Sequence, residues 1–534
     1  MSKFHSFMNE LEIENLMNEG KFSEALPLLL DVLESKNYIS KEILLNNISV
    51  CYLHLGDYDK ARIYLEELIE INPENTTALY NLALSYFFLE EYGVAIKYYE
   101  KLKSTEGMNI DIVYNLGLCY LKVENFEEAD YYFDYLVSQD VPSELIYNLG
   151  IQLITDKHPQ KARKIFTSYL AKKPNDIDST FGLGLSYTEM KEFRKAIECF
   201  SRVLEWDHSR FPSVRVMLGM AYFEVGEIKN AISNIQYVLR HNPDNPEAWY
   251  YMGVIYESTG QKDKAVVALK KAGELSTSTP EIWENLAYIF FNDNQLDDAM
   301  IYFKKAYQIN GNPEFAFKIG LIYMMKDDYK NAIDYFTLSL EKNPENIMEI
   351  KENLGISYYH LGKYNETIGL LSGVVQNGKA KDVVYFIVGS SYMKLGLLNK
   401  AREYLEEGLK INPSNVNILY SLGILEANKE NFDLANSHLE KAVIIERSPE
   451  IIYALALAKM KTGEIEVAVE LFEEYKLFHQ SDVEIMYKLG LLYIQLNQID
   501  KAKKIFKEVL EIIPSNKKAL EYLIELEKYE NKSV

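Results

Sequence analysis

Apolar and polar residues alternate along this chain with the spacing of amphipathic helices, and the pattern returns about every 34 residues. The stretch from residue 42 to residue 75, EILLNNISVCYLHLGDYDKARIYLEELIEINPEN, represents the repeat. In it a small residue, Ser49, precedes Tyr52 by three residues and Ala61 by twelve. Apolar residues at steps of three and four predict two helices, separated by a turn at Gly56. The period predicts an all-α solenoid, in which each repeat packs on its neighbours.

Two positions in each repeat are reserved for small residues. The second of them, twelve residues after the first, is alanine in every repeat except one, where Thr367 stands. Two helices approach closely only where a side chain is small, so these positions predict where the first helix of each repeat crosses the second. At the first position glycine is the commonest residue, as at Gly117, Gly150, Gly184, Gly219, Gly253, Gly320, Gly355, Gly389, Gly423 and Gly490.

The repeat resembles the tetratricopeptide repeat (TPR). The resemblance rests on stretches such as WYYMGVIYESTGQKDKA, from Trp249 to Ala265, and on the closing prolines Pro73, Pro174, Pro243, Pro344, Pro413 and Pro514. It covers roughly residues 6 to 516 in about fifteen repeats. It implies a right-handed α-solenoid superhelix of helix-turn-helix repeats. We expect N-terminal capping helices and a degenerate repeat in residues 1–41, a tandem array in residues 42–516, and a C-terminal capping helix, polar on its outer face, in residues 517–534.

The face of each first helix that avoids the small positions can be followed by steps of three and four residues. By the resemblance, this inner face lines a concave groove. Its candidate binding residues form three rows: the aliphatic row of Leu84, Leu118, Ile151 and Leu185, the aromatic row of Tyr80, Tyr114, Tyr147 and Phe181, and the asparagine row of Asn47, Asn81, Asn115 and Asn148. We expect the groove to bind an apolar peptide or an amphipathic helix.

The three rows also have a plainer interpretation. The apolar rows suit packing between adjacent first helices, without any ligand. The carboxamide of asparagine offers a donor and an acceptor, which suits pairing with an extended peptide backbone. In some TPR proteins the resembling asparagines form such a ladder, but asparagine is also simply common at this place. The binding hypothesis expects these asparagine side chains to face solvent in the free chain.

Three repeats depart from the pattern in ways that carry structural expectations. Glu426 and Lys459 stand where most repeats have tyrosine or phenylalanine, so the packing there should be looser or locally rewired. In a third repeat Thr367 replaces the alanine, and Gly369 and Gly373 lie inside the second helix. These residues predict a weak helix and a hinge near residues 365 to 381. Alternatively, the two glycines permit close packing on the next repeat.

Composition narrows the function further. The formal net charge is −22, and basic residues are interleaved with acidic ones, which disfavours nucleic acid as a ligand. Cys51, Cys119 and Cys199 lack CxxC spacing and the histidines are scattered, so the sequence predicts no disulfide, no metal site and no cofactor. Neither a phosphate-binding loop nor a nucleophile elbow is present, which argues against an enzyme. Without a signal segment or membrane span, the expected setting is cytoplasmic, with no membrane insertion.

The sequence therefore predicts a scaffold or adaptor for protein-protein interaction, with protein or peptide partners. Two alternatives stay open. One is a structural subunit of a larger assembly that associates with copies of itself, a homo-oligomer. The other, disfavoured by the charge and by the apolar inner face, is an RNA-binding helical-repeat protein.

Overall fold

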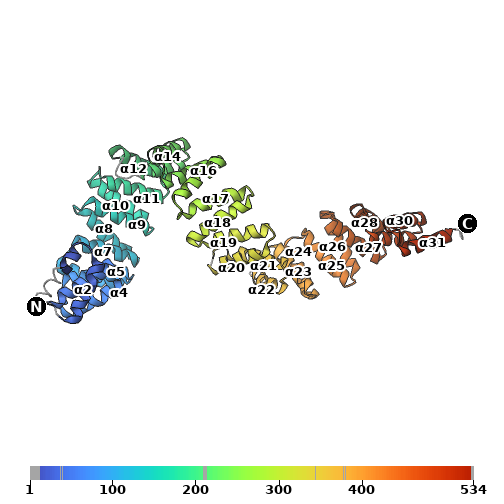
Figure 1. Ribbon diagram of the computed structural model, residues 1–534, viewed down its shortest axis with the longest axis horizontal. Helices are drawn as coiled ribbons and strands as arrows, with labels where there is room; N and C mark the ends of the chain where they lie inside the picture. Colours follow the sequence, from blue (N-terminus) through green and yellow to red (C-terminus); the bar gives the residue numbers. More distant parts are fainter. Residues whose placement is uncertain are drawn as a thin grey trace. The chain divides into compact units, whose positions relative to one another are not determined.

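The computed structural model describes residues 12–36, 38, 40–207, 213–342, 344–376, 378 and 380–530. All regular secondary structure in these residues is helical. Residues 12–18 form a short helix, and thirty longer helices, α2 to α31, follow it (Figure 1). The outermost parts of the expected caps, residues 1–11 and 531–534, lie outside the described residues.

The chain divides into two compact halves, residues 1–255 and residues 256–534. The N-terminal half holds α2 (Phe22–Ser35), α3 (Lys41–His54), α4 (Tyr58–Ile71), α5 (Thr76–Phe88), α6 (Tyr92–Glu106), α7 (Ile110–Lys122), α8 (Phe126–Ser138), α9 (Ser143–Thr155), α10 (Pro159–Lys172), α11 (Ile177–Glu189), α12 (Phe193–Trp206), α13 (Val214–Glu224), α14 (Ile228–His241) and most of α15 (Pro246–Ser258).

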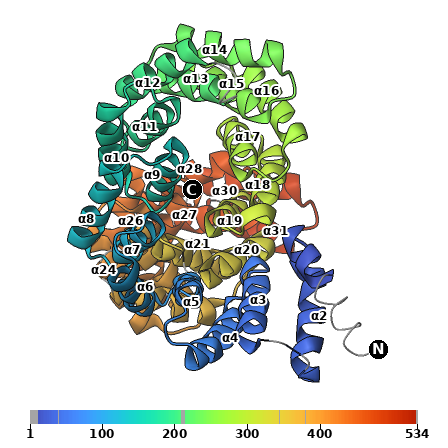
Figure 2. The ribbon, with the colours of Figure 1, turned by 90° about the vertical axis from the view of Figure 1, so that its left-hand side faces the viewer.

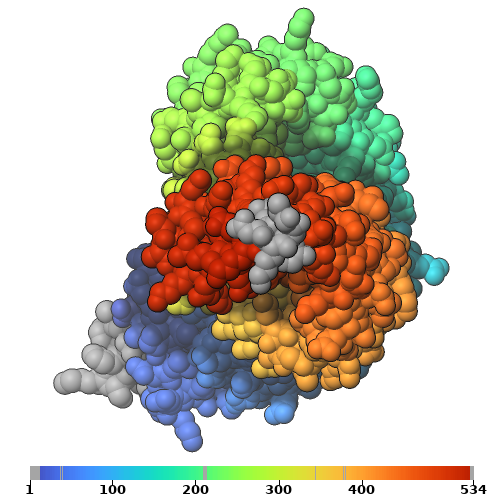
Figure 3. Space-filling model, turned by 90° about the vertical axis from the view of Figure 1, so that its right-hand side faces the viewer, coloured from blue at the N-terminus to red at the C-terminus, as the bar shows by residue number. Residues whose placement is uncertain are grey.

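The C-terminal half holds α16 (Lys262–Leu275), α17 (Pro280–Asn292), α18 (Leu296–Asn310), α19 (Pro313–Met325), α20 (Tyr329–Glu341), α21 (Ile347–His360), α22 (Tyr364–Gln376), α23 (Asp382–Lys394), α24 (Leu398–Ile411), α25 (Val416–Asn428), α26 (Phe432–Ile445), α27 (Pro449–Thr462), α28 (Ile465–Phe478), α29 (Val483–Gln495), α30 (Ile499–Ile512) and α31 (Lys517–Glu530). The last of these helices are coloured red in Figure 3.

Consecutive helices make the principal contacts, so that odd-numbered helices are the first and even-numbered helices the second of each repeat. In the N-terminal half, α3 to α14 follow an arc, and the odd-numbered helices lie along its inner side (Figure 2). The all-α solenoid of helix-turn-helix repeats that the sequence predicts is thereby confirmed.

The small positions lie at the predicted helix crossings. A Cβ atom built on Gly150 would lie 2.0 Å from the ring of Phe166, and one on Gly184 would lie 2.5 Å from the ring of Phe200. Each ring belongs to the second helix of the same repeat. The same contact, 16 residues along the chain, occurs at Gly117, Gly219, Gly320, Gly355, Gly389, Gly423 and Gly490. A side chain at these positions would force the facing ring or branched side chain to shift, which explains why glycine recurs here.

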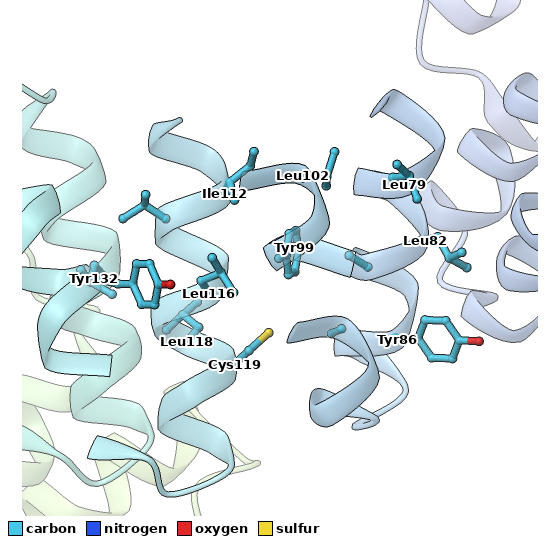
Figure 4. Close-up of a cluster of buried hydrophobic side chains, with 14 of the residues drawn as sticks. Leu79, Leu82, Tyr86, Tyr99, Leu102, Ile112, Leu116, Leu118, Cys119 and Tyr132 are labelled. Atoms are coloured by element: carbon cyan, nitrogen blue, oxygen red, sulfur yellow. The ribbon is translucent and has the colours of Figure 1, made fainter. Parts of the chain in front are cut away.

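The core of the N-terminal half runs between the helices of successive repeats (Figure 4). Tyr99 and Leu102 of α6 pack with Leu116 and Cys119 of α7, and all four are almost completely buried. Burial raises the pKa of Cys119 to about 12, so its thiol stays protonated and unreactive at neutral pH. The three cysteines, Cys51, Cys119 and Cys199, are buried free thiols.

A polar contact ties some repeats to the repeat before. The hydroxyl of Tyr86 donates to Glu66, with 2.5 Å between the oxygens, and that of Tyr120 donates to Glu100 at 3.2 Å. In both pairs the tyrosine lies in a first helix and the glutamate lies in the second helix of the preceding repeat. Tyrosine three residues after the small position therefore both packs and donates a hydrogen bond.

Glu426 replaces this tyrosine in α25, and the contact is rewired as the sequence suggested. The Glu426 side chain is fully buried, forms an ion pair with Arg402 and accepts a hydrogen bond of 2.9 Å from Asn431. Arg402 also lies 3.3 Å from Glu406, which occupies the place of Glu66 in this repeat. The guanidinium group thus separates two carboxylates that would otherwise repel each other.

Lys459 makes a corresponding substitution in α27. Its side chain is only 10% exposed, and its ammonium group pairs with Glu440 at 2.5 Å and with Glu464 at 2.7 Å. Burial lowers the pKa of Lys459, but hydrogen bonds to the two glutamates more than compensate, so that it lies above its ordinary value. The amine therefore stays charged inside this packing contact.

The proposed hinge segment is a continuous helix over Tyr364–Gln376. Thr367 is fully buried, and its hydroxyl lies 3.3 Å from the carbonyl oxygen of Gly355 in α21 and 3.0 Å from that of Lys363. Nothing lies within 4 Å of a Cβ atom built on Gly369 or Gly373. The alternative that these glycines permit close packing is therefore wrong, and the hinge stays a prediction.

α31 packs on α30 through one face. Ala519, Leu523 and Leu526 are buried, whereas Leu520 and Ile524 are 51% and 42% exposed. The expectation of a polar outer face is therefore wrong at these two residues, although charged residues occupy most of it. Its capping role stays a prediction.

Candidate binding surface

The rows of the inner face lie on α3, α5, α7, α9 and α11, all within the N-terminal half. Most of the candidate residues keep part of their surface in solvent. The partly exposed ones are Tyr80, Tyr114, Tyr147, Leu84, Ile151, Leu185, Asn47 and Asn81, and Asn148 is exposed. The structure therefore brings residues from successive repeats onto one accessible face.

Two apolar candidates are buried instead. Leu118 is 5% exposed and Phe181 is 3% exposed. The ring of Phe181 lies 5.8 Å from that of Phe200 and 6.4 Å from that of Tyr147, measured between centroids. The expectation that Leu118 and Phe181 are accessible to a ligand is wrong, because their side chains already fill the space between adjacent helices.

Asn115 also differs from the expectation. Only 8% of its surface is exposed, and its Nδ2 atom donates to the hydroxyl of Tyr80 at 3.0 Å and to the carbonyl oxygen of Asp111 at 2.8 Å. The expectation that Asn115 faces solvent is wrong, because its amide orients the aromatic row. The hypothesis of an asparagine ladder is left with Asn47, Asn81 and Asn148.

The tyrosines of this face are neutral over the physiological pH range. Burial, and then the neighbouring carboxylate of Asp111, raise the pKa of Tyr80, against the effect of the Asn115 hydrogen bond. Burial also raises the pKa of Tyr114, with a smaller contribution from Tyr80. Each hydroxyl therefore keeps its proton and offers a ligand both a donor and an acceptor.

A small cleft opens beside the aromatic row. Its volume is about 220 Å³, enough for one side chain of a ligand, and its lining consists of Thr76, Thr77, Tyr80, Glu106, Asn109, Asp111 and Ile112. Apolar and polar groups meet in it, so it suits a ligand side chain that carries a hydrogen-bonding group. A ligand that lies on the aromatic row could therefore place one side chain in this cleft.

Sequence reasoning missed the carboxylates of this face. Asp111 and Asp178 each stand three residues before an aromatic-row position, and Asp178 accepts a hydrogen bond of 2.9 Å from Ser143. Both lie in the first turn of a helix, where a negative charge is favourable. Acidic residues are common at helix starts, so the sequence pattern does not distinguish these two as part of the inner face.

The described part of the chain contains neither a candidate metal-binding group nor a candidate membrane-spanning helix. No group of three or more histidine, cysteine, aspartate or glutamate residues is placed to hold a metal ion there. Nor does any helix among those residues have the length and apolar character needed to cross a membrane. A chain without metal or cofactor stays a prediction, as does the cytoplasmic setting.

Comparisons with known families decide the assignment. Tetratricopeptide repeat models match residues 11–76 and 216–279, and also residues 178–209, 280–313, 313–346, 383–415 and 483–516. Together they match more than half of the chain. The chain belongs to the tetratricopeptide repeat family. A further model, anaphase-promoting complex, cyclosome, subunit 3, matches residues 54–134.

Curated relatives are similar to this chain over part of their length. The TPR repeat-containing protein MJ1428 of Methanocaldococcus jannaschii is 26% identical over 160 residues, 30% of this chain and 28% of that protein. The BBSome complex member BBS4 homolog of Drosophila melanogaster is 24% identical over 206 residues, 38% of this chain and 37% of that protein. The chain spans only about a third of the length of these relatives.

A solved structure aligns with nearly the whole chain but only loosely. The crystal structure of the APC/C hetero-tetramer Cut9-Hcn1 is 16% identical in sequence, covers 97% of this chain and 96% of its own, and has a TM-score of 0.36. A likeness at this level carries no conclusion about this chain. Repeat solenoids as a class present extended binding surfaces, and the TPR array of this chain is of that kind.

Proposed function

We propose that this chain is a scaffold for protein-protein interaction, which binds an apolar peptide or an amphipathic helix along the inner face of its N-terminal half. The observation that carries the proposal is the run of partly exposed tyrosines, Tyr80, Tyr114 and Tyr147, in three successive repeats. Full burial of a large apolar side chain is worth about 1.5 to 3 kcal/mol. A micromolar complex needs about 8 kcal/mol, so a row of such residues is required.

The polar groups of the same face provide orientation. Asn47, Asn81 and Asn148 keep accessible amides that pair with the backbone of the ligand, whichever side chains that ligand carries. Leu84 and Ile151 contact its apolar side chains. Asn115 acts indirectly, since it fixes the hydroxyl of Tyr80. Recognition of a backbone together with apolar side chains favours peptides over nucleic acids.

The experiment is an affinity capture from cells of the source organism with three forms of the full chain. One is the wild type, the second carries Tyr114→Ser with Ile151→Ser on the inner face, and the third carries Ile63→Ser with Tyr131→Ser. Ile63 and Tyr131 lie on second helices and are 56% and 58% exposed. Circular dichroism establishes that all three are equally folded.

We expect quantitative mass spectrometry to identify proteins that the wild type and the third form retain and the inner-face variant loses. The proposal fails if no captured protein distinguishes the two variants. On this proposal the chain is not an enzyme and acts in the cytoplasm.

Self-association as a structural subunit is a second candidate function. It is favoured by the exposed Leu520 and Ile524 of α31, which an assembly of copies could cover. Sedimentation velocity over a wide range of concentrations tests it, because a self-associating chain sediments faster as the concentration rises. A constant sedimentation coefficient excludes it.

A further inference from the structure

Large apolar side chains gather in solvent at the C-terminal ends of three neighbouring second helices, α26, α28 and α30. They are Ile444, Ile445, Leu477, Phe478, Ile512 and Ile513, with exposed fractions of 82%, 48%, 72%, 57%, 40% and 40%. We refer to these six residues as the C-terminal strip. Exposed apolar residues are normal when they are scattered singly, whereas a contiguous group indicates an interaction site.

The apolar residues of the strip are not a packing requirement of the repeat. Ile445, Phe478 and Ile512 each stand ten residues after the alanine of the helix crossing. Many other repeats have polar residues at this place, namely Ser35, Thr105, Gln139, Lys172, His241 and Lys342. Apolar residues stand at this place in other repeats as well, as Ile71, Trp206, Leu275, Ile309 and Ile411. The second helix that follows α4 has Thr105 there, so Ile71 lacks an apolar counterpart in the next repeat. Packing of the repeat therefore does not require an apolar residue here.

Ion pairs hold the three helix ends together. Arg447, just after α26, donates two hydrogen bonds to Glu474 of α28, with distances of 2.7 and 2.6 Å. Lys476 of α28 pairs in turn with Glu508 of α30. The strip is therefore one surface, carried by the part of the chain coloured orange to red in Figure 3.

A cleft of about 850 Å³ lies between α28 and α30 and adjoins the strip. Its apolar lining includes Leu477 and Ile512 of the strip, together with Met486 and Ile505. The cleft therefore extends the apolar surface inward, so that side chains of a bound helix could enter between the two helices. A recess of this kind anchors a partner more firmly than a flat patch does.

The charged side chains of the cleft favour a positively charged partner. Its lining carries four glutamates, Glu473, Glu474, Glu508 and Glu511, and one lysine, Lys476. The C-terminal ends of helices add partial negative charge at the same place. A second depression on α30 is lined by Asp500, Lys503, Lys504 and Lys507, and it shares Glu508 and Glu511 with the cleft. The glutamates that line the cleft alone are Glu473 and Glu474 of α28.

We propose that the C-terminal strip and this cleft form a second interaction surface, which binds a basic amphipathic helix of a partner protein. The apolar face of such a helix covers the strip, and its flanking lysines or arginines meet the glutamates. The surface lies on second helices, so it is independent of the inner face.

Two fluorescein-labelled peptides of 21 residues provide the test. Each is designed as an amphipathic helix with leucines in a heptad pattern. The remaining positions are lysine in one peptide and glutamate in the other. Fluorescence anisotropy measures their binding to the full chain at physiological ionic strength, where a Debye length of about 8 Å limits the general attraction of the acidic chain.

The chain offers a matched pair of variants. One carries Glu511→Lys with Ile512→Ser in α30, and the other carries Glu70→Lys with Ile71→Ser at the equivalent positions of α4. Both variants remove a carboxylate and an isoleucine side chain from the end of a second helix, and all four side chains are exposed. Leu477→Ser supplies an independent change within the strip.

We expect the α30 variant and Leu477→Ser each to weaken binding of the lysine peptide about tenfold, and the α4 variant to change it less than about twofold. The glutamate peptide should bind the wild type at least about tenfold more weakly. Equal weakening by the α30 and α4 variants overturns the proposal, as does equal affinity for both peptides. If the wild type sediments as a dimer that the α30 variant abolishes, the occupant is a second copy and the proposal of a partner helix is also overturned.

Discussion

At the scale of single residues, many repeats close where a glycine meets a large side chain of the second helix. The ring of Phe166 in α10 shows how little room there is, because it lies between Gly150 of α9 and Gly182 of α11. Cβ atoms built on these two glycines would lie 2.0 and 2.2 Å from the ring. One phenylalanine therefore fixes the spacing within its own repeat and to the next repeat.

Replacing Gly150 by alanine should therefore destabilise the N-terminal half. Overpacking of a core costs about 1 to 3 kcal/mol, and here the fully buried ring, with a glycine on each side, would have to shift. The matched control is Gly369→Ala in α22, where a Cβ atom meets nothing within 4 Å and alanine gains up to about 1 kcal/mol in helix propensity. Urea unfolding followed by circular dichroism should show a lower midpoint for the first variant and an unchanged or higher one for the control. An unaltered midpoint for Gly150→Ala would show that the crossing tolerates a methyl group.

The asparagine row separates into a structural residue and accessible ones. Asn115→Ala removes two hydrogen bonds and leaves the hydroxyl of Tyr80 without its donor, which should cost about 1 to 3 kcal/mol. Asn148→Ala changes an exposed side chain and should leave stability within about 0.5 kcal/mol of the wild type. Thermal melting of the two variants measures the difference. Equal melting temperatures would mean that the Asn115 contacts contribute nothing.

The sequence predicts the helix crossings well because each depends on a contact inside one repeat. In every repeat with this contact, the glycine and the large side chain that it meets stand 16 residues apart, as Gly150 and Phe166 do. The spacing in the sequence therefore predicts the contact. The burial of Asn115 could not be predicted in this way, because it depends on a hydroxyl in the preceding repeat. The burial of Phe181 likewise depends in part on Tyr147 in the preceding repeat, whose ring centroid lies 6.4 Å away. A row in the sequence therefore identifies a face, but not the accessible residues on it.

At the scale of helices, the contacts of α24, α25 and α26 depend on buried charge. His438 of α26 is surrounded by Glu426 and Glu406, which favour its charged form, and by Arg402 and Lys441, which oppose it. Burial makes the largest contribution and lowers the pKa of His438 below its ordinary value of 6.5. The imidazole is therefore neutral in the folded chain at neutral pH.

This burial makes the stability of the C-terminal half depend on pH. Below pH 6.5 the unfolded chain protonates His438 more readily than the folded chain does, so protons favour unfolding. The stability is complete above that pH and declines as the pH falls below it. Urea midpoints at pH 7.5 and 5.5 should therefore differ more for the wild type than for His438→Gln. Identical pH dependence in the two chains would exclude His438 as a source of acid sensitivity.

α22 contains two interior glycines that make no close contact. Each interior glycine costs about 0.8 to 1.0 kcal/mol in helix propensity, and no close packing compensates at Gly369 or Gly373. Hydrogen exchange should therefore be faster for amides of Ile368 to Val375 than for those of Ile232 to Val238 in α14. The double variant Gly369→Ala with Gly373→Ala should slow it. Equal protection of the two helices in the wild type would rule out the hinge.

At the scale of the whole molecule, stability is shared among contacts between neighbouring repeats, so that no single core determines the fold. On the two proposals made above, binding is distributed in the same way. The inner face of the N-terminal half offers aromatic rings and amides, and the C-terminal strip offers aliphatic side chains beside carboxylates. Each surface takes its chemistry from residues that the repeat does not need for packing. This separation allows a repeat family to keep one fold while its binding surfaces change.

The central claim is that the inner face of the N-terminal half binds a partner protein. The most direct measurement is the dissociation constant between the full chain and a protein recovered by affinity capture, determined for the wild type and the two paired variants. The account predicts that Tyr114→Ser with Ile151→Ser weakens binding at least about tenfold, whereas Ile63→Ser with Tyr131→Ser changes it less than about twofold. Equal dissociation constants for both variants would contradict the account.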